Sequence, residues 1–249
     1  MSKATLESPD ADGPVTLLFS GGVDSTMAAC TLAEQHDHVH LVSYKNGYGH
    51  YKMERTQRRA EEVAQRYPGK VTHSLISIQE LFEQMVLSTL EEDYRRHGSG
   101  FIWCMGCKLA MHTRTIIYNV ENAIYRAADG SSFATSEMVE QMPVSVAKIR
   151  GFYCEYGFAF QNPVYTVKRE DSIAELKRRG FRQGIRIRDR FLGIQPKCKP
   201  GELYYMPMIL RGTEPVHKEE AVARYIEEKL QWARGHITAT LNRGGGGAR

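Results

Sequence analysis

Short apolar runs alternate with amphipathic segments along the first ninety residues. Apolar and β-branched residues predict buried strands at 15–19, 39–44 and 71–76. Apolar positions at helical spacing predict helices over residues 24–34, 52–67 and 78–90. Strands that alternate with helices are joined by helical crossovers, so this order predicts a parallel sheet with helices on both faces.

The second half of the chain continues this pattern less regularly. Helices are predicted over residues 109–128, 147–156, 169–179 and 217–235, a fourth strand over 131–135 and a fifth extended segment over 158–167. Glycines and prolines predict an irregular segment at 181–215. The expected fold class is therefore α/β: a Rossmann-like parallel sheet of five strands covered by helices on both faces, with a small C-terminal helical and irregular extension.

These elements divide the chain into four predicted parts. Residues 1–13 and 244–249 are expected to be disordered tails, residues 14–167 form the main domain, and residues 168–243 form the C-terminal extension. No run of about 18 apolar residues is present, which argues against a membrane-spanning helix. The first residues lack the basic start and apolar stretch of a signal peptide, so a cytoplasmic location is expected.

The charge of the chain changes this picture little. A formal net charge of +4 does not by itself indicate a nucleic-acid partner. Residues 168–190 carry nine Lys and Arg against four Asp and Glu, which fits either contact with phosphates or a solvated helix face.

The stretch LLFSGGVDST at 17–26 carries the most specific chemical signal. Two glycines after an apolar strand allow a tight turn that brings an anion close to main-chain N–H groups. The helix that follows adds the positive end of its dipole, and Ser20, Ser25 and Thr26 add hydroxyl donors. Asp24 would repel a bare phosphate, but it fits a Mg²⁺ ion held between its carboxylate and the phosphates. A Walker A loop is excluded because no GKS or GKT follows at the required spacing.

This stretch resembles the SGGxDS signature of the PP-loop ATP pyrophosphatase family, part of the HUP (adenine nucleotide alpha hydrolase) superfamily. The match covers Ser20, Gly21, Gly22, Asp24 and Ser25. The resemblance implies a HUP-type α/β fold and cleavage of ATP between its α and β phosphates. Members of the family adenylate a carbonyl oxygen of the substrate, release pyrophosphate and then lose AMP to a nucleophile. The adenine is expected near the ends of the first strands, at Ser43, Tyr44 and Lys45.

The five cysteines do not suggest a disulfide framework, because their number is odd and no feature points to secretion. Cys104 and Cys107 form a CxxC pair, which fits a redox pair or half of a zinc site. Cys198 lies between prolines in QPKCKP, flanked by two lysines, a setting that suits a thiolate. Cys30 is expected to be a small core residue.

A CxxC pair followed 91 residues later by one cysteine resembles the iron–sulfur-dependent branch of PP-loop tRNA thiolation enzymes. The resemblance implies that Cys104, Cys107 and Cys198 hold a 4Fe-4S cluster whose fourth iron stays open to a hydrosulfide. Two alternatives remain open. One is a persulfide with a resolving thiol and no cluster, and the other is a closed zinc site that includes Cys154.

The expected function is that of an ATP-dependent sulfurtransferase. The residues expected to act are Asp24, Cys104, Cys107 and Cys198, with ATP, Mg²⁺ and a sulfur donor. The acceptor is expected to be a tRNA base or a small molecule. The small molecule is included because the zinc-finger ends common among the tRNA thiolation enzymes are absent. The sequence is compatible with a homodimer. The alternative functions are a zinc-containing ligase that forms an amide or nitrile, as in the deazaguanine nitrile synthases, and a nucleotide-binding module without chemistry.

Overall fold

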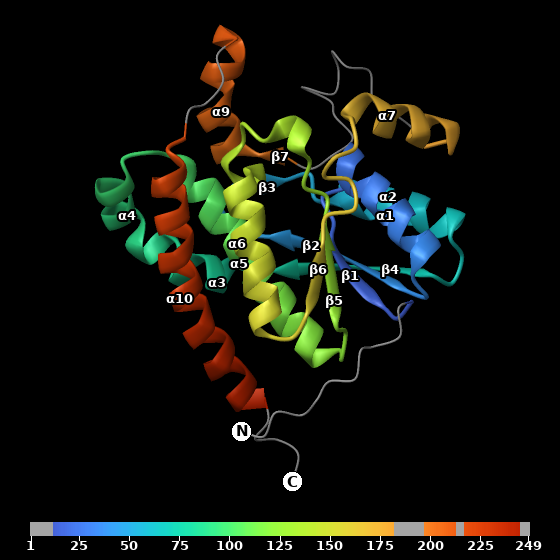
Figure 1. Ribbon diagram of the computed structural model, residues 1–249, viewed down its shortest axis with the longest axis horizontal. Helices are drawn as coiled ribbons and strands as arrows, with labels where there is room; N and C mark the ends of the chain where they lie inside the picture. Colours follow the sequence, from blue (N-terminus) through green and yellow to red (C-terminus); the bar gives the residue numbers. More distant parts are fainter. Residues whose placement is uncertain (1–11, 182–196, 213–216, 245–249) are drawn as a thin grey trace.

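The computed structural model describes residues 12–181, 197–212 and 217–244. Its centre is a parallel sheet with the strand order β4-β2-β1-β5-β6 (Figure 1). The strands are β1 (Val15–Leu18), β2 (Val39–Lys45), β4 (Val71–Ser77), β5 (Arg126–Asp129) and β6 (Ala159–Gln161). A separate antiparallel ribbon joins β3 (His50–Tyr51) to β7 (Lys197–Cys198).

Helices cover both faces of the sheet (Figure 1). One face carries α1 (Val23–Gln35), α2 (Glu54–Arg66) and α7 (Arg169–Arg178). The other face carries α3 (Gln79–Met85), α5 (Phe101–Glu121), α6 (Pro143–Glu155) and α10 (Glu219–Gly244). Beside these lie α4 (Leu90–His97), α9 (Lys199–Arg211) and the short 3-10 helices η1 (Leu87–Thr89), η2 (Phe133–Thr135) and η3 (Val139–Gln141).

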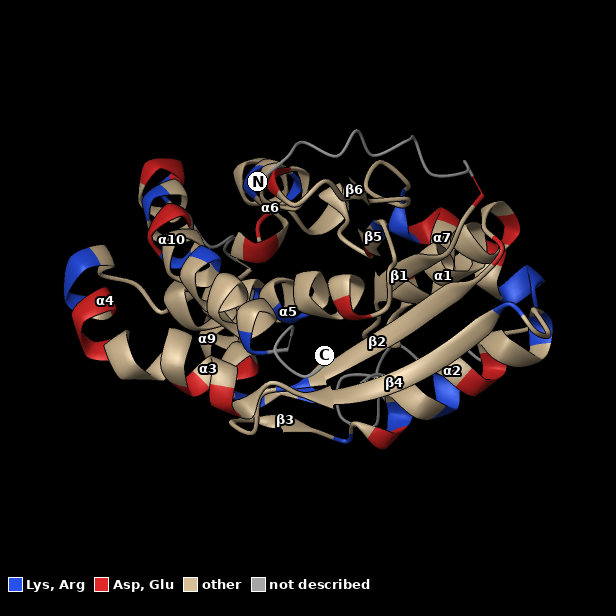
Figure 2. Ribbon diagram, turned by 90° about the horizontal axis from the view of Figure 1, so that it is seen from below, with Lys and Arg blue, Asp and Glu red and all other residues tan. Residues whose placement is uncertain are grey.

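The hydrophobic core consists of two clusters, one on each face of the sheet. Successive residues of a strand point to opposite faces. Val42 and Ala127 therefore belong to one cluster, whereas Leu41 and Ala128 belong to the other. Charged residues lie mostly on the outer helices, and β2 and β4 are largely free of them (Figure 2). The predicted fold class, a five-stranded parallel α/β sheet covered on both faces, is confirmed.

The predicted fourth strand is wrong by five residues. The strand is Arg126–Asp129, whereas residues 131–135 contain the 3-10 helix η2. The strand was missed because Arg-Ala-Ala-Asp lacks the β-branched residues that are typical of strands. Ala127 and Ala128 are fully buried between closely packed layers, where small side chains fit. The helix before it was also misplaced: α5 spans Phe101–Glu121, so the CxxC pair lies within a helix and not ahead of one.

The C-terminal part contains more helix than the sequence indicates. Residues 199–211 of the segment predicted to be irregular form α9, in spite of Pro207 in its interior. The last helix continues to Gly244, nine residues beyond its predicted end. Residues 182–196, 213–216 and both chain ends lie outside the described residues, and the division at 167/168 stays a prediction. No helix in the described part of the chain combines the length and apolarity needed to cross a bilayer.

Candidate functional site

The loop between β1 and α1 has the geometry of an anion-binding turn. Gly21 has a φ of +73°, a conformation that side chains rarely adopt, and Gly22 is the N-cap of α1. The Ser20 and Ser25 hydroxyls are 2.9 Å apart, and the Thr26 hydroxyl donates to the carbonyl of Gly22 at 2.7 Å. The helix N-terminus and the serine hydroxyls thus lie together at the carboxyl end of β1, as the sequence predicts.

Asp24 lies in the first turn of α1 and has a cationic partner from a distant segment. The Arg169 guanidinium, from the start of α7, donates to the Asp24 carboxylate at 2.6 Å. Burial raises the pKa of Asp24, and Arg169 partly offsets that rise. The sequence indicated only a basic stretch at 168–190. The described part of that stretch places Arg169 at the phosphate loop.

A pocket of about 210 Å³ extends from the phosphate loop to Cys198. Its wall includes Ser20 of the loop, Tyr44 of β2, His50 of β3 and Cys198 of β7. The Tyr44 hydroxyl bonds to Thr115 at 2.8 Å. Lys45 is exposed at the end of β2. The pocket therefore offers one volume in contact with both predicted sites, whereas the position of the adenine stays a prediction.

The structure brings Cys104, Cys107 and Cys198 together. Cys104 and Cys107 are one turn apart on α5. Gly201 lies between the Cys104 and Cys198 sulfurs, since a β-carbon built at Gly201 would be 3.7 Å from the first and 3.8 Å from the second. The ribbon pairs Cys198 with His50, whose Nε2 is 3.8 Å from the Cys107 sulfur.

The other two cysteines have different surroundings. Cys154 is exposed on the last turn of α6, and Cys30 is fully buried on the inner face of α1. The expectation that Cys30 is a core residue is therefore confirmed.

The spacing of the three sulfurs bears on which metal they fit. A tetrahedral zinc site with Zn–S bonds of about 2.3 Å places its sulfurs about 3.8 Å apart. Within residues 12–181, 197–212 and 217–244, the trio of ligand atoms that lie within 4.8 Å of one another comes from Asp93, His97 and Glu228, not from the cysteines. At least one pair of the three cysteine sulfurs is therefore more than 4.8 Å apart, which is wider than the spacing around a single zinc ion.

The thiols lie in a poorly solvated environment. Burial raises the pKa of Cys107 to about 12 and also raises the pKa values of Cys104 and Cys198. The Asn46 amide donates to the Cys107 sulfur at 3.3 Å, and the backbone N–H of Tyr48 fixes that amide by donating to its oxygen at 3.0 Å. A bound metal would supply the positive charge that thiolate ligands need here.

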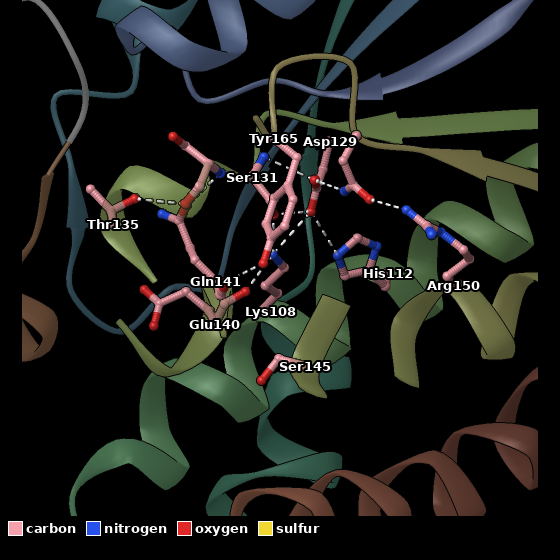
Figure 3. A network of polar contacts seen from close by, with 12 residues as sticks. Lys108, His112, Asp129, Ser131, Thr135, Glu140, Gln141, Ser145, Arg150 and Tyr165 are labelled. Carbon is pink, nitrogen blue, oxygen red and sulfur yellow. Dashed lines mark hydrogen bonds and ion pairs between the residues drawn. The ribbon is translucent and has the colours of Figure 1, made fainter. Parts of the chain in front are cut away.

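A buried polar network connects the cysteine helix to the end of β5 (Figure 3). Lys108, directly after Cys107, forms an ion pair with Asp129 at 3.0 Å, and its ammonium also donates to the hydroxyl of Ser131 at 2.8 Å. His112, one turn further along α5, places its Nε2 3.6 Å from the Asp129 carboxylate. Lys108 holds the pKa of Asp129 well below its usual range, although burial opposes this shift.

Asp129 ends β5 beside β1, where the strand order reverses. In parallel α/β sheets, ligands bind outside the carboxyl ends of strands at such a point. Sequence analysis missed Asp129 because the strand was placed five residues too late. Lys108 and His112 lie four residues apart on one helix face, and this spacing is the signal in the sequence that could have joined them.

A family model described as asparagine synthase matches residues 2–116. No curated protein sequence matches the chain.

Three solved structures resemble the chain at low sequence identity. A 4-thiouridine synthetase–RNA complex with bound ATP has a TM-score of 0.51 and 12% identity, over 91% of this chain and 53% of that one. The U34-tRNA thiolase NcsA of Methanococcus maripaludis, with its 4Fe-4S cluster, has a TM-score of 0.46 and 12% identity, over 88% and 72%. The NMN synthetase of Francisella tularensis has a TM-score of 0.43 and 15% identity, over 88% and 85%. At this identity the likeness concerns the fold.

Proposed function

We propose that the chain is a PP-loop ATP pyrophosphatase and that it acts as an ATP-dependent sulfurtransferase with a 4Fe-4S cluster on Cys104, Cys107 and Cys198. The observation that carries this proposal is that Cys198, which lies near Cys104 and Cys107, shares a pocket with Ser20 of the phosphate loop. The cluster, when bound, would supply an iron that presents sulfide to the activated substrate.

The phosphate loop supports the first half of the reaction. Ser20, Ser25 and the N-terminus of α1 bind the β and γ phosphates, with Mg²⁺ held by Asp24. Thr26, whose hydroxyl donates to the Gly22 carbonyl, supports the turn of the loop. A carbonyl oxygen of the acceptor attacks the α phosphorus, the bond to the β-phosphate oxygen breaks, and pyrophosphate leaves. Tyr44 and Lys45 are proposed to lie near the adenine.

The thiol site supports the second half. Sulfide attacks the adenylated carbon, the carbon–oxygen bond breaks, and AMP leaves with that oxygen. Cys198 is in the wall of the same pocket as Ser20, so both steps take place without transfer of the intermediate to another site. Cys107 is buried and the other two cysteines are partly buried, which limits the access of water to an adenylated intermediate beside them.

The acceptor is proposed to be a tRNA base or a small molecule with an equivalent carbonyl. The structure that shares this fold in complex with RNA and ATP supports RNA as one candidate. The pocket of about 210 Å³ would admit a single base or a small heterocycle. The proposal includes a reducing, cytoplasmic location, because all five cysteines are free thiols.

The test is an anaerobic assay with MgATP, labelled sulfide and either bulk tRNA or free uracil. The proposal expects AMP, pyrophosphate and sulfur-labelled product in equal amounts, and it expects none of them from Asp24→Asn. Product formation with ammonia in place of sulfide would indicate the amide-forming ligase. Binding of ATP without release of pyrophosphate under any of these conditions would indicate a nucleotide-binding module.

A further inference from the structure

The ammonium of Lys108 is held by three different groups. It forms an ion pair with Asp129 at 3.0 Å and donates to the Ser131 hydroxyl at 2.8 Å and the Glu140 carbonyl at 2.7 Å (Figure 3). An ammonium has three donors, so its capacity is fully used. The Lys108 side chain is only 14% exposed, and the first turns of α5 are thereby tied to the end of β5 and to η3.

Asp129 is held as firmly from its own side. One carboxylate oxygen accepts the backbone N–H of Ser131 at 2.9 Å and the amide of Asn162 at 2.6 Å. Gly130 follows, and a carbon added there would lie 2.7 Å from the backbone nitrogen of Ser25. The backbone after Asp129 is therefore in direct contact with the first turn of α1, at the phosphate loop.

We propose that the Lys108–Asp129 ion pair is a strut that fixes the cysteine-bearing turn of α5 against the phosphate loop, so that Lys108 is a positioning residue. Lys108 directly follows Cys107, and Asp129 is one residue from the contact with the loop. A movement of the loop on nucleotide binding is thus transmitted to the thiols through two side chains. The strut itself depends only on these contacts. Its role in sulfur transfer rests on the proposed function.

A second buried ion pair offers a matched control. Lys229 of α10 lies 2.6 Å from Asp93 of α4, and both side chains are 7% exposed. In each pair a hydroxyl group bridges the two charges, because it accepts from the lysine and donates to the carboxylate. The Ser131 hydroxyl does so for Lys108, and the Thr89 hydroxyl does so for Lys229. The two pairs have the same chemistry, but the Lys229 pair joins two outer helices and lies apart from the phosphate loop.

The experiment compares the double variants K108M/D129N and K229M/D93N with the unaltered full-length chain. Each double variant removes both charges, so no unpaired charge stays buried, and methionine fills most of the lysine volume. The cluster-free protein is treated with iodoacetamide, with and without MgATP, and the alkylation of Cys107 and Cys30 is followed by peptide mass spectrometry. Cys30 is fully buried on the inner face of α1 and reports global unfolding.

The proposal expects K108M/D129N to raise the Cys107 rate by about tenfold and to leave the Cys30 rate unchanged, because local opening sets the rate. It expects MgATP to slow Cys107 alkylation in the unaltered chain and in K229M/D93N but not in K108M/D129N, although ATP still binds. The single variant K108R keeps Asp129 and should retain the protection of Cys107 by MgATP, because arginine can pair with the same carboxylate.

Three outcomes would overturn the strut. They are equal acceleration at Cys107 and Cys30, unchanged protection of Cys107 by MgATP in K108M/D129N, and no effect of MgATP in the unaltered chain. None of these measurements needs iron or an acceptor. A protein that lacks iron would therefore contradict the proposed function but not the role of the Lys108–Asp129 pair. Any of the three alkylation results would contradict that role but not the proposed function.

Discussion

The Asp24 carboxylate and the Arg169 guanidinium lie 2.6 Å apart, although 145 residues separate them in the chain. The ion pair places α7 against the phosphate loop and makes the loop less negative. An incoming MgATP therefore meets a loop at which the Asp24 carboxylate is paired with Arg169.

We expect Arg169→Gln to weaken MgATP binding by about tenfold, the scale of one charge-assisted hydrogen bond. The measurement is a calorimetric titration with MgATP. Arg178→Gln is the matched control, because Arg178 pairs with Glu175 on the exposed side of α7. Unchanged or tighter binding in Arg169→Gln would contradict this role of the ion pair.

Replacing Cys198 by alanine is expected to remove most of the bound iron while MgATP binding is retained. Cys198 contributes its sulfur to the thiol site but does not belong to the phosphate loop. Cys154→Ala is the control, since Cys154 is exposed on α6. Iron content by elemental analysis and nucleotide affinity by titration give the answer, and equal iron in both variants would argue against the ligand set.

Two glycines in neighbouring helices should respond to alanine in opposite directions. A carbon at Gly106 would lie 2.6 Å from the Tyr225 hydroxyl, so Gly106→Ala should push α5 and α10 apart and cost about 1–3 kcal/mol. No heavy atom lies within 4 Å of the same position at Gly151, so Gly151→Ala should add about 0.5–1 kcal/mol through helix propensity. Thermal unfolding measures both, and a rise in Tm for Gly106→Ala would contradict the packing.

Stability is expected to fall as the pH drops below about 6.5, the usual histidine pKa. Burial lowers the pKa of His112, which has no exposed surface and contacts the Tyr153 hydroxyl. The unfolded chain then binds more protons than the folded one, so the free energy of unfolding decreases towards lower pH. One such histidine contributes up to about 1.4 kcal/mol per pH unit. Urea unfolding at pH 8 and pH 5.5 should show a smaller difference for His112→Gln, and an equal difference would refute this assignment.

The sequence was most informative where local chemistry alone decides the structure. The signature from Ser20 to Ser25 predicted the loop, its glycine turn and the helix after it, because each depends on residues adjacent in the chain. The alternation of apolar strands and amphipathic helices likewise predicted the parallel sheet, since burial on both faces requires it.

The sequence was least informative where distant packing decides the structure. The strand that ends at Asp129 contains two alanines, which are fully buried against the helix layers on the two faces of the sheet. Alanine has no preference for strands, so the sequence gives no strand signal there. The partners of Lys108 and Asp24 lie 21 and 145 residues away, so no local pattern could identify them. For the same reason, the division of the chain at 167/168 remains a prediction.

The most direct test of the central claim is the iron and acid-labile sulfide content of the chain, purified without oxygen, together with its absorption spectrum. The account predicts a brown protein with about four iron atoms and about four sulfides per chain, both lost in Cys104→Ala. A colourless protein with one zinc ion per chain would contradict it.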